Sequence, residues 1–375
     1  MLKVLITGAD GFIGKNLQLY LAERKDVQVA KFTRQDSIAA LDEKLADTDF
    51  VFHLAGVNRP TDLGEFATGN TMLTEALTAA AIRLAERSGK RIPILLSSSI
   101  HAVRDNAYGI SKLGSERALS AASAQGIPTV IFRLPNVFGK WCKPNYNSAV
   151  ATFCHNVAHD LPIQVNDPAA EVNLVYIDDV IDAFVRVMDG KAPRLNDAGF
   201  AEVIPNYHAT VGELAELIRK FRLSRDSLVT ERVGTDLVRA LYSTYVSYLP
   251  TEAFSYSVPK YGDQRGVFVE MLKTPDAGQF SYFTAHPGIT RGGHYHHTKT
   301  EKFLVIKGKA LFKFRQMDTG QSYELVTEGD IPRIVETVPG WTHDITNIGD
   351  EEMVVMLWAN EIFDRARPDT FACPL

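Results

Sequence analysis

Short strand-like runs alternate with longer helical patterns through roughly the first 190 residues. The strand-like runs are KVLIT, DVQVAKF, FVFHLAG, PILLSSS and TVIFRLP. Between them lie NLQLYLAER, LTEALTAAAIRLAERSG and SKLGSERALSAASAQG, and VGELAELIRKF and TDLVRALYSTYVSYL follow later in the chain. Strands that alternate with helices are typical of parallel crossover units. We therefore expect an α/β domain with a Rossmann-type, doubly wound parallel sheet.

The pattern changes after Pro250, where closely spaced strand signals follow one another without an intervening helix. These signals are SYSV, GVFVEMLK, QFSYFTA, EKFLVIKGKALFKFRQ, SYELV, RIVETV and EEMVVMLWAN. Gly, Pro and Asp separate them, which is typical of an all-β barrel or jelly roll. The sequence thus predicts two domains, 1–247 and 248–375.

Composition narrows the functional classes. A chain of 375 residues can form two cores, and its net charge of −5 comes without basic clusters, so a nucleic-acid or membrane surface is not expected. The cysteines are scattered and odd in number, at Cys142, Cys154 and Cys373, so a disulfide framework is not expected. A protein without disulfides fits the reducing environment of the cytoplasm. Neither a membrane span nor a signal peptide is expected.

The first chemical motif is the glycine loop at Gly8, Gly11 and Gly14, which follows the KVLIT strand and opens a helix. Glycines there permit a tight turn and close approach of the backbone to a pyrophosphate, and the helix N-terminus supplies an anion site. A glycine triplet alone also fits an ordinary turn, but the strand–turn–helix context predicts dinucleotide binding.

A second motif is Tyr108 with Lys112, four residues apart at the start of a helical pattern. They share one helix face, and a neighbouring ammonium favours a tyrosinate that can exchange a proton with an alcohol or carbonyl. The run Ser97 to Ser99 ends the PILL strand, where a hydroxyl can polarise the same carbonyl. A chance exposed pair and ordinary turn serines remain the alternative.

In the C-terminal part, His294 and His296 are two residues apart and Glu301 opens the next strand. Alternate side chains on a strand face the same way, so two imidazoles and a carboxylate can meet around a divalent metal. His343 is a fourth candidate ligand, and His297 is expected to face away. The ligand set does not decide between Zn, Fe, Mn and Ni.

Together the N-terminal motifs resemble the extended short-chain dehydrogenase/reductases that act on nucleotide sugars. The resemblance covers about residues 1–245. It includes H-x-A-G at His53, R-L-P-N-V-F-G at Arg133 and YIDDV at Tyr176. It implies that Tyr108 is the acid, Lys112 its tuner and ribose clamp, and Ser99 the carbonyl ligand. The cofactor contacts that it implies are Gly8, Gly11, Phe12, Ile13, Gly14, Thr33, Arg34, Leu54, Ala55, Tyr108 and Lys112.

The end of the second strand bears on cofactor choice. An NAD enzyme places an acid there for the ribose 2′-OH, but this strand ends in Thr33-Arg34, and an arginine suits a 2′-phosphate. We therefore expect NADPH. Asp36 lies two residues late, and a small backbone shift could still bring it to the ribose.

The spacing from Gly288 through His294, His296 and Glu301 to Gly308 resembles the first cupin motif, and Gly340, His343 and Asn347 resemble the second, with Pro339 displaced by one. The phrases DQRGVF at Asp263 and RGGHY at Arg291 resemble the metal-free deoxysugar 3,5-epimerases, where a histidine at the place of His294 is the base. His296 and Glu301 favour a metal instead, which could stabilise an enediolate.

The fusion of the two domains resembles the CapF family of bifunctional capsular polysaccharide enzymes. That likeness implies C3 epimerisation, then NADPH-dependent C4 reduction, of UDP-2-acetamido-2,6-dideoxy-4-hexulose. The product would be UDP-2-acetamido-2,6-dideoxy-talose, a precursor of N-acetyl-fucosamine, and the likeness also implies zinc and a homodimer. Two alternatives stay open: a reductase whose cupin only binds or dimerises, and a non-catalytic NADP-binding sensor.

Overall fold

The computed structural model describes residues 1–254, 256–296, 299–317, 319–338, 341–366 and 368–375. Its contacts divide the chain into two compact units. Unit 1 comprises Met1–Ile218 and Arg239–Leu249, and unit 2 comprises Arg219–Val238 and Pro250–Leu375. The domain division at residue 247 stays a prediction, because it concerns where independently folding parts begin. Within the described residues, no helix combines the length and apolar character needed to cross a membrane.

Unit 1 is built on a five-stranded parallel sheet with the order β2-β1-β3-β4-β5. Its strands are β1 (Leu2–Thr7), β2 (Val27–Phe32), β3 (Phe50–His53), β4 (Ile94–Ser99) and β5 (Thr129–Leu134). The chain reverses direction across the sheet between β1 and β3, and ligands of such sheets bind at the carboxyl ends of the strands at this switch point. The expected doubly wound parallel sheet is confirmed.

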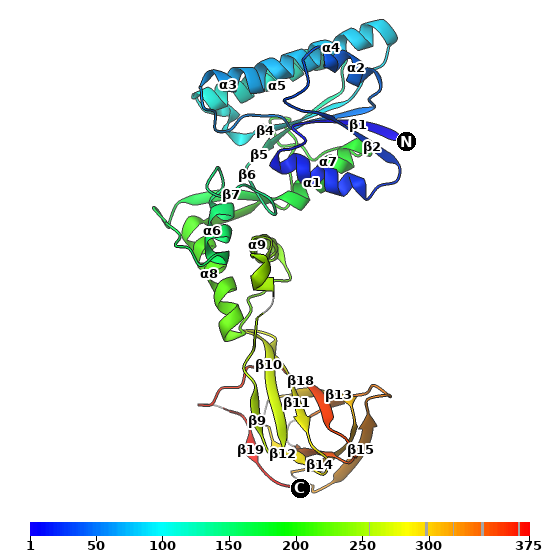
Figure 1. Cartoon of the computed structure of the whole chain (residues 1–375), viewed down its shortest axis with the longest axis vertical. Coiled ribbons are helices and arrows are strands. Elements are labelled where there is room, and N and C mark those ends of the chain that lie inside the picture. Colours follow the sequence, from blue (N-terminus) through cyan, green and yellow to red (C-terminus); the bar gives the residue numbers. More distant parts are fainter. Residues whose placement is uncertain (255, 297–298, 318, 339–340, 367) are drawn as a thin grey trace. The chain divides into compact units, whose positions relative to one another are not determined.

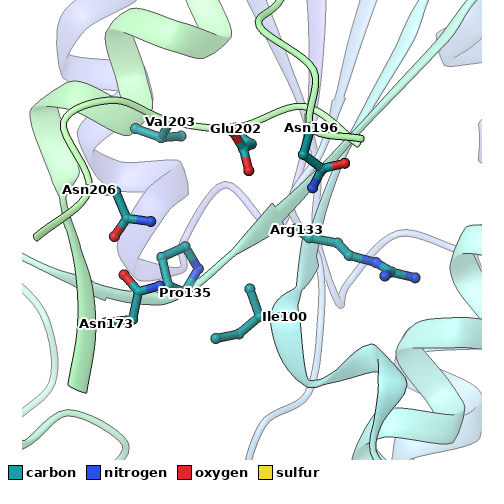
Figure 2. A pocket seen from close by; sticks show the side chains of 8 residues that line it. All are labelled: Ile100, Arg133, Pro135, Asn173, Asn196, Glu202, Val203 and Asn206. Atoms are coloured by element: carbon teal, nitrogen blue, oxygen red, sulfur yellow. The ribbon is translucent and has the colours of Figure 1, made fainter. Parts of the chain in front are cut away.

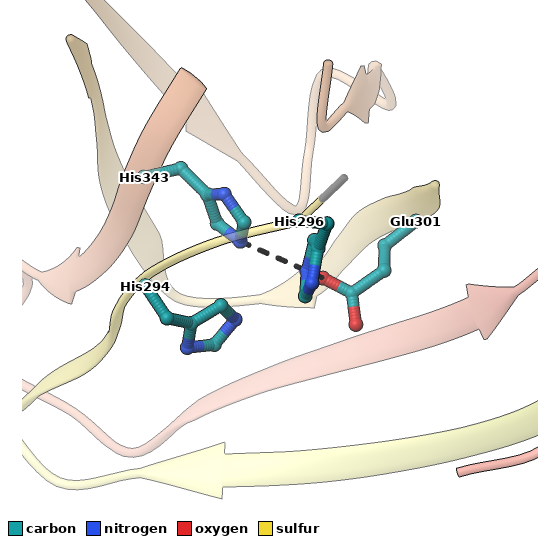
Figure 3. Close-up of side chains that lie close together, drawn as sticks. All are labelled: His294, His296, Glu301 and His343. Carbon is teal, nitrogen blue, oxygen red and sulfur yellow. Dashed lines mark hydrogen bonds and ion pairs between the residues drawn. The ribbon is translucent and has the colours of Figure 1, made fainter. Parts of the chain in front are cut away.

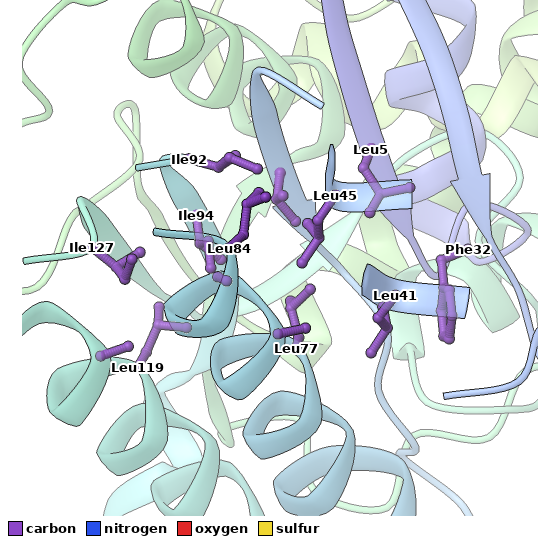
Figure 4. Packing of buried hydrophobic residues seen from close by; sticks show 14 of the residues in the cluster. Leu5, Phe32, Leu41, Leu45, Leu77, Leu84, Ile92, Ile94, Leu119 and Ile127 are labelled. Carbon is purple, nitrogen blue, oxygen red and sulfur yellow. The ribbon is translucent and has the colours of Figure 1, made fainter. Parts of the chain in front are cut away.

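Helices cover both faces of this sheet (Figure 1). Helices α1 (Phe12–Ala22) and α7 (Ile177–Met188) lie on one face, and α2 (Ala40–Ala46), α4 (Leu73–Ser88) and α5 (Ala107–Ala124) lie on the other. The second face buries a continuous leucine- and isoleucine-rich cluster between strands and helices, as Figure 4 shows. The central strands are buried on both sides, which explains why they read as unbroken apolar runs.

The remaining elements of unit 1 extend it beyond the sheet. A small sheet joins β6 (Asn136–Phe138), β7 (Glu171–Tyr176) and β8 (Tyr207–Thr210). The other described helices are α3 (Gly64–Phe66), α6 (Ala149–Ala158), α8 (Val211–Ser227), α9 (Asp236–Val246), a π-helical stretch Ala67–Met72 and 3₁₀ turns at Ile100–Val103 and Thr251–Phe254. The turn at Thr251–Phe254 belongs to unit 2, and α9 also begins in unit 2. By contacts, α8 passes from unit 1 into unit 2 after Ile218.

Unit 2 is an antiparallel β structure of two sheets. The six-stranded sheet has the order β16-β13-β18-β11-β10-β9 and the five-stranded sheet β15-β14-β17-β12-β19. Their strands are β9 (Tyr261–Asp263), β10 (Gly266–Thr274), β11 (Gly278–Ala285), β12 (Thr290–Tyr295), β13 (Glu301–Lys307), β14 (Lys309–Gln316), β15 (Ser322–Glu328), β16 (Ile334–Glu336), β17 (Trp341–Asn347), β18 (Met353–Ala359) and β19 (Phe371–Ala372). Inward residues from both sheets, such as Phe303, Phe312 and Val355, form one core. This confirms the predicted cupin-type jelly roll.

The structure corrects two details of the predicted strands. The SYSV run is not a strand over 256–258, where the ring of Tyr256 instead lies 4.3 Å from the Arg225 guanidinium. The long EKFLVIKGKALFKFRQ run is two strands, because Gly308 adopts a left-handed φ of 84° and turns the chain between β13 and β14.

Leu77 tests the importance of the unit 1 core, since its side chain is fully buried on α4. We expect Leu77→Ala to lower the free energy of unfolding by about 2–5 kcal/mol, because the change leaves a cavity. Leu19→Ala is the matched control, as Leu19 is 47% exposed. Urea unfolding of both variants is the measurement, and equal stabilities would contradict the assigned core.

Candidate functional site

The backbone of the glycine loop between β1 and α1 lies very close to neighbouring backbone. Gly8 has a φ of 70°, and a Cβ added there would lie 2.6 Å from the Ala55 backbone nitrogen. A Cβ on Gly14 would lie 2.3 Å from the carbonyl oxygen of Gly8. Gly11 is the N-cap of α1 and donates its own N–H to the Gly8 carbonyl at 3.0 Å. No described side chain caps this helix, so its first N–H groups remain suited to an anion.

The remaining expected contacts of this loop follow from the fold. Phe12 and Ile13 form the first turn of α1, and Leu54 and Ala55 follow β3 directly against Gly8. Neighbouring His53 is fully buried and hydrogen-bonds Thr7 at 2.7 Å and Thr74 at 2.8 Å. Burial, followed by the charge of Lys112, lowers the pKa of His53 to about 3. His53 is thus a neutral group that fixes the loop after β3.

Ser99 and Tyr108 are brought together although a 3₁₀ turn separates them. Ser99 ends β4, and Tyr108 lies in the first turn of α5, which Asn106 caps by accepting the Gly109 N–H at 2.8 Å. Burial raises the pKa of Tyr108, and a hydrogen bond with the side chain of Ser99 opposes the rise. Ser99 is therefore the serine of the run that faces the phenol.

The other two serines of the run have different contacts. The carbonyl of Ser97 accepts a hydrogen bond from the Lys112 ammonium at 3.0 Å. The hydroxyl of Ser98 donates to Glu116 of α5 at 2.6 Å. Of the three serines, Ser99 is therefore the one beside the tyrosine, while its catalytic role stays a prediction.

Lys112 is a buried ammonium one helical turn beyond Tyr108. Its burial lowers the pKa of Lys112 to about 8, and the charge of Glu116 works in the opposite direction. Glu116 is itself buried and accepts two hydrogen bonds from Arg133, at 2.7 and 3.0 Å. Sequence reasoning missed Glu116, although its spacing of four residues from Lys112 places it on the same helix face.

Asn70 is a second residue that sequence reasoning missed. It is buried in the π-helical stretch, accepts the Val57 N–H at 2.8 Å and donates to the Ser111 hydroxyl at 2.9 Å. It thereby ties the loop after β3 to α5. A Cβ on Gly56 in this loop would lie 3.3 Å from the Lys112 ammonium. No spacing pattern in the sequence marks Asn70.

Arg34 and Asp36, just after β2, have different surroundings. Arg34 is exposed. One carboxylate oxygen of Asp36 accepts the backbone N–H of Thr33 at 2.7 Å, and the other lies 3.2 Å from the Lys44 ammonium. The backbone hydrogen bond from Thr33, followed by the contact with Lys44, lowers the pKa of Asp36. Both oxygens of Asp36 are therefore engaged within the turn.

In unit 2 the four expected metal ligands come together between the two sheets (Figure 3). One nitrogen or oxygen from each of His294, His296, Glu301 and His343 lies within 4.8 Å of the others. Glu301 opens β13 in the six-stranded sheet, while His294 and His343 pair across β12 and β17 in the five-stranded sheet. His296 follows β12 and is 1% exposed.

The chemistry of this donor set fits a divalent cation. His296 Nε2 lies 3.1 Å and His343 Nε2 lies 3.5 Å from the same Glu301 oxygen. Both ring nitrogens of His343 are buried without a hydrogen-bond partner among the described residues. Burial, then His343, lowers the pKa of His294 to about 4, so its ring is neutral near pH 7. Three imidazoles and one carboxylate could hold the expected metal.

The charge on Glu301 is consistent with this role. Burial alone would raise its pKa, but the His296 and His343 rings and the charge of Lys299 outweigh burial and hold the pKa below its usual range. Of the other motif residues, Asn347 donates to the carbonyls of Ala285 and Glu351 and so holds a turn. His297, Pro339 and Gly340 lie outside the described residues.

Known proteins match both units. Residues 4–197 match the NAD dependent epimerase/dehydratase family, and residues 261–371 match the polysaccharide biosynthesis C-terminal domain. A Pseudomonas aeruginosa protein, UDP-2-acetamido-2,6-beta-L-arabino-hexul-4-ose reductase, is 60% identical over 99% of this chain and 98% of its own.

Solved structures of other proteins are also similar to this chain. The capsular polysaccharide assembling protein CapF from Staphylococcus aureus is 42% identical with a TM-score of 0.89, covering 99% of this chain and 100% of that one. A UDP-glucuronic acid 4-epimerase from Bacillus cereus, 21% identical with a TM-score of 0.51, covers 58% of this chain and 83% of its own and shows the fold alone.

The fold and the two sites define an extended short-chain dehydrogenase/reductase fused to a cupin domain. The family match implies a nicotinamide cofactor for the first of these. With the relatives that span its whole length, the chain belongs to the CapF family.

Proposed function

We propose that this chain is a bifunctional nucleotide-sugar enzyme. Unit 2 inverts C3 of UDP-2-acetamido-2,6-dideoxy-4-hexulose, and unit 1 reduces the C4 ketone with hydride from NADPH. The product is UDP-2-acetamido-2,6-dideoxy-talose, a precursor of N-acetyl-fucosamine for a surface polysaccharide. The enzyme works in the cytoplasm, as a homodimer.

One observation carries the proposal: a single chain holds both a Ser99–Tyr108–Lys112 cluster and a buried four-ligand cluster. The first suits proton and hydride exchange at a carbonyl, and the second suits charge that develops beside a carbonyl. The 60% identical relative is named as a reductase of a UDP-linked 4-keto sugar, which supports the substrate class.

In the reduction, Ser99 and Tyr108 act on the C4 carbonyl oxygen. Ser99 donates a hydrogen bond to this oxygen, and the Tyr108 phenol gives it a proton as hydride reaches C4. The buried Lys112 ammonium stabilises the tyrosinate that forms, because a positive charge in a dry site interacts strongly with a developing negative charge. The Glu116–Arg133 pair and the Ser97 carbonyl keep this ammonium in place.

In the epimerisation, the C4 ketone makes the proton on C3 acidic, and the intermediate carries negative charge on the ketone oxygen. A metal held by His294, His296, Glu301 and His343 would supply Lewis-acid stabilisation of that charge. Three of the four ligands, His296, Glu301 and His343, are buried, so the cluster is largely shielded from water. Epimerisation precedes reduction, because reduction removes the ketone that acidifies C3.

The end of β2 supports NADPH rather than NADH as the cofactor. Asp36, the acid that could bind a ribose 2′-OH, is engaged by Thr33 and Lys44. Arg34 is exposed beside it and suits a 2′-phosphate. Zinc is the metal that the family likeness implies.

The alternative is a reductase whose cupin only binds substrate or joins subunits. The inward-facing histidine and glutamate cluster argues against it, because a module that only binds or dimerises does not need four buried polar groups gathered at one point. Two assays on one UDP-4-keto sugar separate the cases: NADPH oxidation, and deuterium uptake at C3 from D₂O without NADPH. Reduction without any exchange at C3 would favour the alternative.

We predict that Tyr108→Phe lowers NADPH oxidation by ~10²–10⁴-fold, because the proton donor is lost. Cofactor affinity and deuterium uptake at C3 should stay near wild type. Stopped-flow oxidation and fluorescence titration with NADPH are the measurements. Tyr323→Phe, at an exposed tyrosine of unit 2, is the matched control. Near wild-type turnover of Tyr108→Phe would remove the phenol from the mechanism.

We predict that Arg34→Ala weakens NADPH binding far more than NADH binding. A charge-assisted contact with a phosphate contributes about 1.5–3 kcal/mol, or one to two decades in affinity. Titration of the variant with both cofactors is the measurement, so the ratio is its own control. An unchanged ratio would show that Arg34 does not contact the 2′-phosphate.

We predict that His296→Ala loses the metal, of which wild-type protein should contain about one ion per chain, because one imidazole fewer leaves an open, weaker site. Deuterium uptake at C3 should fall with it, while NADPH binding persists. His286→Ala is the control, since its side chain is 53% exposed beside Glu352. Elemental analysis and the exchange assay are the measurements. Metal-free wild-type protein with normal exchange would instead restore His294 as the base.

A further inference from the structure

The C-terminal residues 368–375 cross the strands that carry the metal ligands. We propose that these residues, which we name the C-terminal strap, position the ligands of the metal centre. In this proposal, which rests on the proposed metal site, Asp369 is a positioning residue that sets His296 in its metal-binding form. The strap also holds the buried Lys299 beside Glu301.

The contact between the strap and His296 determines which ring nitrogen carries the proton. His296 Nδ1 lies 2.6 Å from the backbone carbonyl oxygen of Asp369. A carbonyl oxygen only accepts hydrogen bonds, so Nδ1 must carry the proton. Nε2 is then the ring nitrogen left for a metal, and it faces the Glu301 oxygen at 3.1 Å. A divalent cation would take the place of any proton between Nε2 and the carboxylate and bind both groups, so the strap orients the ring for a metal.

Asp369 holds an unusual backbone conformation to make this contact. Its φ is 33°, in the left-handed region that Asn, Asp and Gly tolerate and β-branched residues do not. Its carboxylate also accepts the backbone N–H of Lys299 at 2.8 Å. One strap residue therefore binds the chain on both sides of the segment that joins His296 to Lys299.

Lys299 places a second cation in the same site. Its side chain is 7% exposed, and its ammonium lies 3.5 Å from the Glu301 oxygen that the histidines do not contact. It donates to the strap hydroxyl of Thr370 at 3.3 Å and lies 5.5 Å from the ring centroid of Phe363. Glu301 is thus held from both sides, with one oxygen toward Lys299 and the other toward His296 and His343.

The strap is anchored along its whole length. Strand β19 pairs with β12 at His294 and Tyr295, and the rings of Phe371 and Tyr295 stack with centroids 5.4 Å apart. Farther along, Cys373 donates its N–H to the Gly293 carbonyl at 2.8 Å, and Arg315 donates to the Pro374 carbonyl at 3.0 Å. Because these contacts surround both His294 and His296, docking of the strap and metal binding should be coupled.

Two substitutions at Asp369 separate the backbone contact from the side chain. Asp369→Val disfavours the left-handed conformation and turns the carbonyl away from His296, while Asp369→Asn permits it. We expect Asp369→Val to bind Co²⁺ about 10–100-fold more weakly than the wild type, as is usual for loss of a hydrogen bond to a metal-bound histidine. Asp369→Asn should remain close to wild type. Titration of chelator-treated full-length protein with Co²⁺, followed by visible absorption, gives affinity and coordination together.

Asp364→Val is the matched control, because Asp364 is exposed and, among the described residues, accepts only a local N–H, from Ala366 at 2.9 Å. NADPH binding of each variant reports whether the rest of the chain is folded. Three results would each overturn the role of the strap while leaving the metal site standing. They are wild-type affinity in Asp369→Val, equal losses in the Val and Asn variants at position 369, and an equal loss in Asp364→Val. Wild-type protein that binds no Co²⁺ would reject the metal centre and the strap with it.

Discussion

The buried ammonium of Lys112 is the constraint on which the unit 1 site depends. An ammonium without water destabilises the fold unless acceptors and an opposite charge surround it. Here the Ser97 carbonyl accepts its hydrogen bond and Glu116 supplies the charge, while Arg133 and Ser98 hold Glu116. Strand β4, helix α5 and strand β5 must therefore hold one fixed arrangement relative to one another. The same arrangement brings Ser99 against Tyr108.

Unit 2 also buries a charged side chain, but there the charge is negative. Glu301 is a buried carboxylate on the inner face of β13, where Phe303 and Val305 continue the apolar core. Lys299 neutralises one of its oxygens, and the other faces His296 and His343, whose rings are neutral donors when a metal is bound. Each unit thus buries a charged side chain and surrounds it with groups that stabilise the charge.

The sequence predicted what local periodicity and spacing determine. The strand–turn–helix pattern around Gly8, the shared face of Tyr108 and Lys112, and the two-residue spacing of His294 and His296 each correspond to one local geometry. The residues that were missed act through long-range contacts. Asn70 reaches Val57 and Ser111 across the fold, and Asp369 reaches His296 from 73 residues away. Only Glu116 and Lys299 had a local signal, since their spacing places them on the faces of Lys112 and Glu301.

The two proposed reactions make incompatible demands on one pocket, which accounts for two sites on one chain. Inverting C3 requires that the negative charge on the ketone oxygen persist while a proton leaves one face and returns to the other. Reducing C4 requires that the same oxygen be protonated at once, as hydride arrives. A tyrosine placed to protonate the oxygen would quench the enediolate, and a metal bound to the oxygen would compete with the phenol. Separate sites remove this conflict, and reduction then makes the inversion irreversible by removing the ketone.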